Sequence, residues 1–168
     1  MHTHHRVRLS AVALATALAA TVAGCGVAGE IADGLDESDA KEHAVDTGAE
    51  GKESQLLAAW VPDDARDVRV MQRTTGSERL LTFEYSGDVP EDCLAIATPG
   101  SPTTDELEQA YATDLRTAEF PVDRWSTSPT LTADWWPSGQ QDQTTHLCGR
   151  WWVSADGGTF YAFGAELV

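Results

Sequence analysis

The chain has 168 residues, of which 42% are hydrophobic and 23% are charged, as is usual for a globular protein. Its 27 Asp and Glu residues outnumber its 11 Lys and Arg residues, which gives a formal charge of −16. Binding to nucleic-acid phosphates or to anionic lipid headgroups needs basic surface, so this balance argues against a nucleic-acid binder and against adsorption through a basic patch. The length allows one domain besides any processed or unstructured segment.

Residues 1–24 predict an export signal. Arg6 and Arg8 precede an apolar run over residues 9–23, and no acidic residue occurs before Glu30. The run is too short and too rich in alanine for a membrane span, which needs about 20 strongly apolar residues. A buried helix of a cytosolic domain is the alternative, but a basic flank before a short apolar run is typical of a secretory signal.

The apolar run ends in the sequence Val22-Ala23-Gly24-Cys25, which resembles the lipobox of bacterial lipoproteins. In that family a branched aliphatic residue, most often leucine, and two small residues precede the lipidated cysteine. The resemblance covers residues 1–25 and implies cleavage before Cys25, a lipid on its thiol, and a location on the extracytoplasmic face of the cell membrane. Two acyl chains on one cysteine give stable anchoring. An ordinary secretory signal with a nearby cysteine is the alternative.

Residues 25–54 predict the lipidated cysteine followed by a disordered, acidic tether. The segment after Cys25 has nine acidic residues, two lysines and no aromatic residue. Such a composition buries too little apolar area to offset the entropy of ordering the chain. The alternative is calcium binding, although the spacing differs from that of an EF-hand loop. Its ligands would be Asp33, Asp36, Glu37 and Asp39.

Residues 55–168 predict a single α+β domain. Apolar and polar residues alternate in several short runs, which indicates strands, and glycine-containing loops between neighbouring runs indicate hairpins. Acidic residues in the first turn after Thr104 favour the start of a helix there. We expect a small antiparallel sheet of about five strands with one helix packed on it. The expected elements are strands over 67–73, 79–85, 93–97, 144–154 and 159–166 and a helix over 104–118.

Cys93 and Cys148 predict a disulfide. They are the two cysteines that remain when Cys25 is assigned to lipid, and an even pair in an exported domain is expected to be bonded. A metal site is the alternative, but two isolated thiols without a close His or Cys partner make a poor one. We therefore expect neither a metal nor another cofactor.

His146 is the only histidine within residues 55–168, and it limits the catalysis that the domain can perform. The sequence lacks the serine-hydrolase, zinc-protease, P-loop and dinucleotide-binding motifs. Any Ser-His-Asp triad would depend on His146, whose neighbours Thr144 and Thr145 lie on the same expected strand. We expect a protein that is not an enzyme. The alternative is a cell-envelope hydrolase that uses His146 with an acidic residue.

All six tryptophans lie within residues 55–168, and they are the most unusual feature of the domain's composition. Neighbouring residues on a strand face opposite sides, so we expect Trp151 in the core and Trp152 outside, unless the helix or loops cover both. An exposed tryptophan offers a flat apolar surface to sugar rings or partner proteins. The sequence therefore predicts a binding or interaction module that meets an envelope protein or glycan. The expected binding face contains Trp136, Trp152, Arg150 and His146.

Overall fold

A computed structural model describes residues 39–168, which belong to a compact unit spanning residues 36–168. The expected signal peptide, Cys25 and the first part of the expected tether lie outside the described residues. Within residues 39–168, none of the helices has the length and apolar character needed to cross a membrane.

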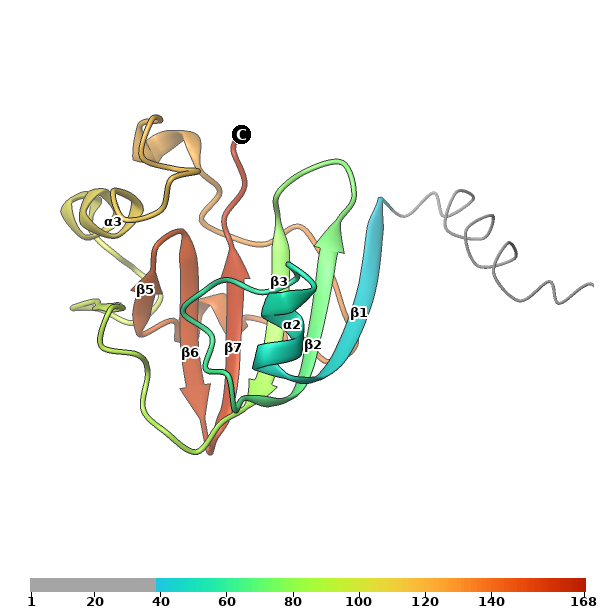
Figure 1. Ribbon diagram of the computed structural model, residues 1–168. Helices are drawn as coiled ribbons and strands as arrows, with labels where there is room; N and C mark the ends of the chain where they lie inside the picture. The colour runs from blue at the N-terminus through green and yellow to red at the C-terminus, as the bar shows by residue number, and fades with distance from the viewer. Residues whose placement is uncertain (1–38) are drawn as a thin grey trace, which may run out of the picture. The chain divides into compact units, whose positions relative to one another are not determined.

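The described residues form a seven-stranded antiparallel sheet with the order β1-β2-β3-β7-β6-β5-β4 (Figure 1). Strands β3 and β7 pair at the centre, so the sheet joins the early and late parts of the chain. The strands are β1 (Ala40–Thr47), β2 (Arg66–Arg73), β3 (Arg79–Glu84), β4 (Leu94–Ala95), β5 (His146–Cys148), β6 (Trp151–Asp156) and β7 (Thr159–Gly164). The helices are α2 (Gly48–Glu53) and α3 (Thr104–Tyr111), with the 3-10 turns η1 (Val122–Arg124) and η2 (Gln140–Gln143).

The expected fold of about five strands with one helix is wrong, because this part of the chain is richer in β-structure. The two hairpins were located correctly in outline, since β2 pairs with β3 and β6 pairs with β7. Two strands were missed. The first is β1. The second is an additional strand within residues 144–154, where one strand was expected and the structure has two, β5 and β6.

Strand β1 and helix α2 lie in the segment that was expected to be tether. The compact fold therefore begins near Ala40 and not at residue 55. Charged side chains on the outer strand of a sheet discourage pairing with other chains, so an acidic composition is compatible with an edge strand. Thr47 caps α2 by accepting a hydrogen bond from the Glu50 amide at 3.2 Å. Gly48 lets the helix pack closely, since a Cβ there would meet the Pro62 carbonyl.

A two-residue turn at Gly149 and Arg150 separates β5 from β6. Cys148 pairs with Trp151, and Leu147 pairs with Trp152. Gly149 has a φ of 60°, which glycine adopts readily at the first central position of a tight hairpin. The strand-like composition on both sides of this turn concealed the hairpin.

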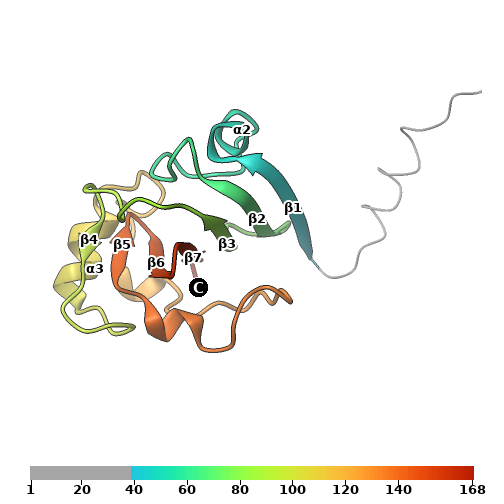
Figure 2. The same ribbon diagram turned by 90° about the horizontal axis from the view of Figure 1, so that it is seen from below.

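Both faces of the sheet are covered, so the expected exposure of Trp152 is wrong. Trp151 lies in a core on the α2 side, while Trp152 lies in a second core on the other face. Figure 2 shows α2 on one side of the sheet and the segment around residues 120–143 on the other. Each of the two indoles is only 4% exposed. The alternation of faces was predicted correctly, but α3 and the residues after it shield the second face.

A disulfide and a capped helix fix the region beside β5. Cys93 and Cys148 are bonded, as predicted, which ties the segment before β4 to the end of β5. Helix α3 begins at Thr104, the first residue of the expected helix, and Thr103 and Glu106 form a reciprocal capping box there. The helix ends at Tyr111, and turns follow in place of the expected helical residues up to 118.

Candidate functional site

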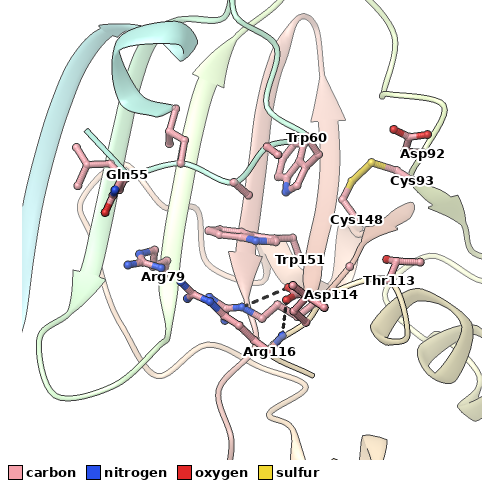
Figure 3. Close-up of a pocket in the computed structure, with 17 residues that line it drawn as sticks. Gln55, Trp60, Arg79, Asp92, Cys93, Thr113, Asp114, Arg116, Cys148 and Trp151 are labelled. Atoms are coloured by element: carbon pink, nitrogen blue, oxygen red, sulfur yellow. Dashed lines mark hydrogen bonds and ion pairs between the residues drawn. A yellow bond between two sulfur atoms is a disulfide. The ribbon is translucent and has the colours of Figure 1, made fainter. Parts of the chain in front are cut away.

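A cavity of about 730 Å³ opens at the end of the sheet where β3 and β6 begin and β5 ends. Five parts of the chain line it: the segment 55–60 after α2, Arg79, the pair Asp92 and Cys93, residues 113–116 after α3, and residues 148–151 at the β5–β6 turn (Figure 3). Its volume falls in the range of about 300–1,000 Å³ that is usual for small-molecule sites.

One side of the cavity is apolar and includes two indoles. Trp60 and Trp151 contact each other edge to face, with ring centroids 6.1 Å apart and an interplanar angle of 66°. Trp60 is half-buried, whereas Trp151 forms part of the sheet core. Leu56, Leu57 and the Cys93–Cys148 disulfide extend this wall.

Arg150 lines the cavity and is only 1% exposed. Its guanidinium donates hydrogen bonds to the carbonyl oxygens of Ala165 and Ser77, the latter at 2.9 Å. It also lies over the Trp151 ring, with its Cζ 5.4 Å from the centroid, and its Nε is 3.8 Å from Asp114 Oδ2. These contacts occupy the guanidinium on every side, so Arg150 is chiefly a structural cation.

Burial lowers the pKa of Arg150 to about 10. The neighbouring Arg116 and Arg79 lower it further, while Asp114 and Glu166 act in the opposite direction. The side chain still carries its charge at neutral pH, because the pKa remains well above 7. Arg150 therefore adds positive potential beneath the cavity.

The sheet makes room for this buried guanidinium through a glycine. Gly164 at the end of β7 pairs with both Trp151 and Arg79. A Cβ at Gly164 would lie 3.1 Å from Arg150 Nη1, which is tighter than ordinary contact. Glycine at this position therefore opens the space that Arg150 fills between its neighbouring strands.

Two more arginines reach the cavity. Arg79, the first residue of β3, shares a sheet face with Trp151 through their common neighbour Gly164. Burial and the charge of Arg116 lower the pKa of Arg79, and its Nε is buried without a hydrogen-bond partner. Arg116 is exposed at the rim. Within residues 39–168 no acidic side chain forms an ion pair with either arginine.

The residues of the expected binding face are not brought together. Arg150 lines the cavity, but Trp152 is buried in the opposite core. Trp136 is half-buried on that opposite side, where it packs edge-on against Tyr161 at 6.1 Å. Trp60, Arg79 and Arg116 were not predicted as site residues, because they lie far apart along the chain and belong to no motif.

His146 lies at the start of β5. Its Nδ1 lies 2.9 Å from Thr145 Oγ1, and burial lowers its pKa. It lines neither the main cavity nor the smaller one of about 390 Å³ beside β1 and β2. Among the residues that the structure describes, no group of three His, Cys, Asp or Glu side chains is arranged to hold a metal ion.

No protein-family model, curated protein or solved structure matches the chain. The residues of the cavity are therefore the basis on which a ligand can be assigned. They combine an apolar wall with three guanidinium groups and two aspartates, Asp92 and Asp114.

Proposed function

We propose that the protein is a bacterial lipoprotein of the cell envelope and that its globular domain is a non-catalytic binding module. The lipobox-like sequence ending at Cys25 supports the anchor on the extracytoplasmic face of the membrane. The cavity at the end of β3, β5 and β6 supports the binding role. One observation carries this role: three guanidiniums meet an indole-containing wall in a chain whose formal charge is −16.

The composition of the cavity favours binding over catalysis. A nucleophile or general base needs a partner that activates or orients it. The titratable groups on the lining are arginines and two aspartates, one of which, Asp114, lies beside the buried Arg150. Ligand sites typically have apolar walls and a few fixed polar groups, and this lining has that composition. The predicted location makes envelope proteins and glycans the sources of a ligand.

The binding role predicts that a neutral aromatic probe enters this cavity. The experiment uses the protein from Gly26 onward, which retains the whole compact unit of residues 36–168. Phenol at millimolar concentration should shift the amide resonances of residues 56–60 and Gly149 in a two-dimensional NMR spectrum, and leave β1 unchanged. Ala59→Trp, which places bulk on the lining, should abolish these shifts, whereas Ala155→Trp at the far end of β6 should not. Absent or scattered shifts in the parent protein would refute the site.

The anchor predicts that Cys25→Ser removes the lipid. In cells fed a clickable palmitate analogue, the parent protein should carry the label and enter the detergent phase on phase separation. The serine variant should lack the label and accumulate as a precursor or appear in the medium, because serine has no thiol for the thioether bond. Labelling that persists in the variant, or that is absent from both proteins, would contradict lipidation at Cys25.

A further inference from the structure

We propose that the ligand of this cavity is a small carboxylate with an apolar body, and that Arg79 and Arg116 bind its carboxylate group. The inference rests on the proposed function and adds the chemical class of the ligand. It follows from the distribution of charge, from the donors that remain free, and from the apolar wall beside them.

The positive charge of the arginines in the cavity is only partly balanced by the acidic residues near them. Asp114 lies beside Arg150, with 3.8 Å between Oδ2 and Nε, and accepts a hydrogen bond from the backbone amide of Arg116 at 2.9 Å. Asp92 is exposed next to the disulfide, on the other side of the cavity from the arginines (Figure 3). The guanidiniums of Arg79 and Arg116 are therefore left for an anion from outside.

Among the arginines of the cavity, Arg79 is the one with an unsatisfied buried hydrogen-bond donor. Its Nε is buried and has no hydrogen-bond partner. A buried donor that lacks an acceptor is unfavourable, and an ionised acceptor would satisfy it and its charge together. A guanidinium presents parallel N–H groups that match the two oxygens of a carboxylate. Arg150 cannot take this role, because its terminal nitrogens already donate to Ala165 and Ser77.

The charge and the walls favour a monoanion over a phosphate dianion. Three guanidiniums face two aspartates, so the lining has one positive charge in excess. The apolar wall of the cavity contains Leu56, Leu57 and Trp60, which suit an apolar group and give a hydrated dianion few hydrogen bonds. In a carboxylate joined to an aromatic ring or an alkyl chain, the charged group would pair with the arginines and the apolar group would pack against this wall.

The experiment compares three probes of similar shape by isothermal titration calorimetry on the protein from Gly26 onward: phenylacetate, phenylacetamide and phenyl phosphate. Phenylacetate should bind about tenfold more tightly than the neutral amide, as expected for charge-assisted hydrogen bonds. Arg79→Gln and Arg116→Gln should each remove most of this difference. Arg66→Gln alters the net charge equally at an exposed position, the first residue of β2, and should have no effect.

The outcomes separate this inference from the proposed function. Equal affinities for phenylacetate and phenylacetamide at the cavity would refute the inference that the ligand is a carboxylate, but would leave the proposal of a binding module intact. Tighter binding of phenyl phosphate would overturn it in favour of a phosphorylated ligand. If none of the three probes binds and phenol does not perturb the cavity, both proposals fail. Because Arg116 is exposed, Arg116→Gln keeps the test decisive even if Arg79→Gln does not fold.

Discussion

Replacing Trp152 by alanine should lower the free energy of unfolding by about 3–5 kcal/mol, as much as replacing Trp151. Both indoles are 4% exposed, so either change removes a large apolar side chain and leaves a cavity in a core. Trp152 also lies against Phe163, with ring centroids 5.3 Å apart, and its Nε1 donates a hydrogen bond to Tyr111 Oη at 3.1 Å. Because a domain of this size is stable by about 5–15 kcal/mol, this loss is a large fraction of the total stability.

Urea denaturation of the two alanine variants measures this effect, and two further variants provide controls. Trp152→Phe keeps most of the apolar volume but loses the hydrogen bond to Tyr111, so it should be intermediate. Trp136→Ala should cost less, because Trp136 is only half-buried. If Trp152→Ala unfolds at the same urea concentration as the parent, the core on the α3 side of the sheet does not exist as described.

The burial of Trp152 shows what the alternation of residues along a strand cannot predict. The pattern correctly placed Trp151 and Trp152 on opposite faces, since that depends only on the period of an extended chain. Whether the second face meets water depends on what covers it. The covering segment between α3 and β5 is rich in Thr, Ser and Pro and has no helical or strand periodicity, so its position could not be predicted.

Strand β1 was missed for a different reason. Residues 26–54 have a composition typical of disorder, and averaging over the whole segment concealed a strand at 40–47. An edge strand has only one neighbour and needs few apolar residues. In β1 the half-buried His43 and Val45 pair with the buried Val70 and Val68. The pattern within these eight residues was therefore more informative than the charge of the segment.

The disulfide and the cavity differ in how far sequence could locate them. Counting cysteines was enough to pair Cys93 with Cys148, because few alternatives remained. Arg79, Arg116 and Arg150 come from the start of β3, the turns after α3 and the β5–β6 turn. The pairing of β3 with β7 and of β7 with β6 brings Arg79 close to the β5–β6 turn, and the contact of Asp114 with Arg150 holds the segment of Arg116 beside that turn. Without that topology, the arginines had no recognisable pattern.

The second large effect concerns Glu78, a buried acid just before β3 that is 2% exposed. It accepts hydrogen bonds from the Thr130 hydroxyl at 2.7 Å and from the Leu131 amide at 3.1 Å, as well as from the Thr130 amide. It also pairs with Arg73, with 2.7 Å between Nη2 and Oε2. The carboxylate thus joins the β2–β3 loop to the segment that covers the sheet.

Replacing Glu78 by alanine should cost about 3–5 kcal/mol of unfolding free energy, the usual range when one partner of a buried ion pair is removed. The change leaves the Thr130 and Leu131 amides without their acceptor and Arg73 without its closest acidic partner. Urea denaturation at neutral pH measures this loss. An Ala variant within about 1 kcal/mol of the parent would contradict a structural role for the carboxylate.

The same network should make stability depend on pH in the acid range. Burial alone would raise the pKa of Glu78, but the hydrogen bonds from Thr130, Arg73 and the Leu131 amide outweigh it and hold the pKa below its ordinary value. A group whose pKa is lowered by folding stabilises the protein above its unfolded pKa and loses that contribution as pH falls through the folded value.

The stability difference between the parent and Glu78→Gln should therefore be constant near neutral pH and shrink below about pH 4. Parallel curves for the parent and Glu78→Gln down to about pH 2 would mean that the ionised carboxylate is not what holds this segment over the sheet.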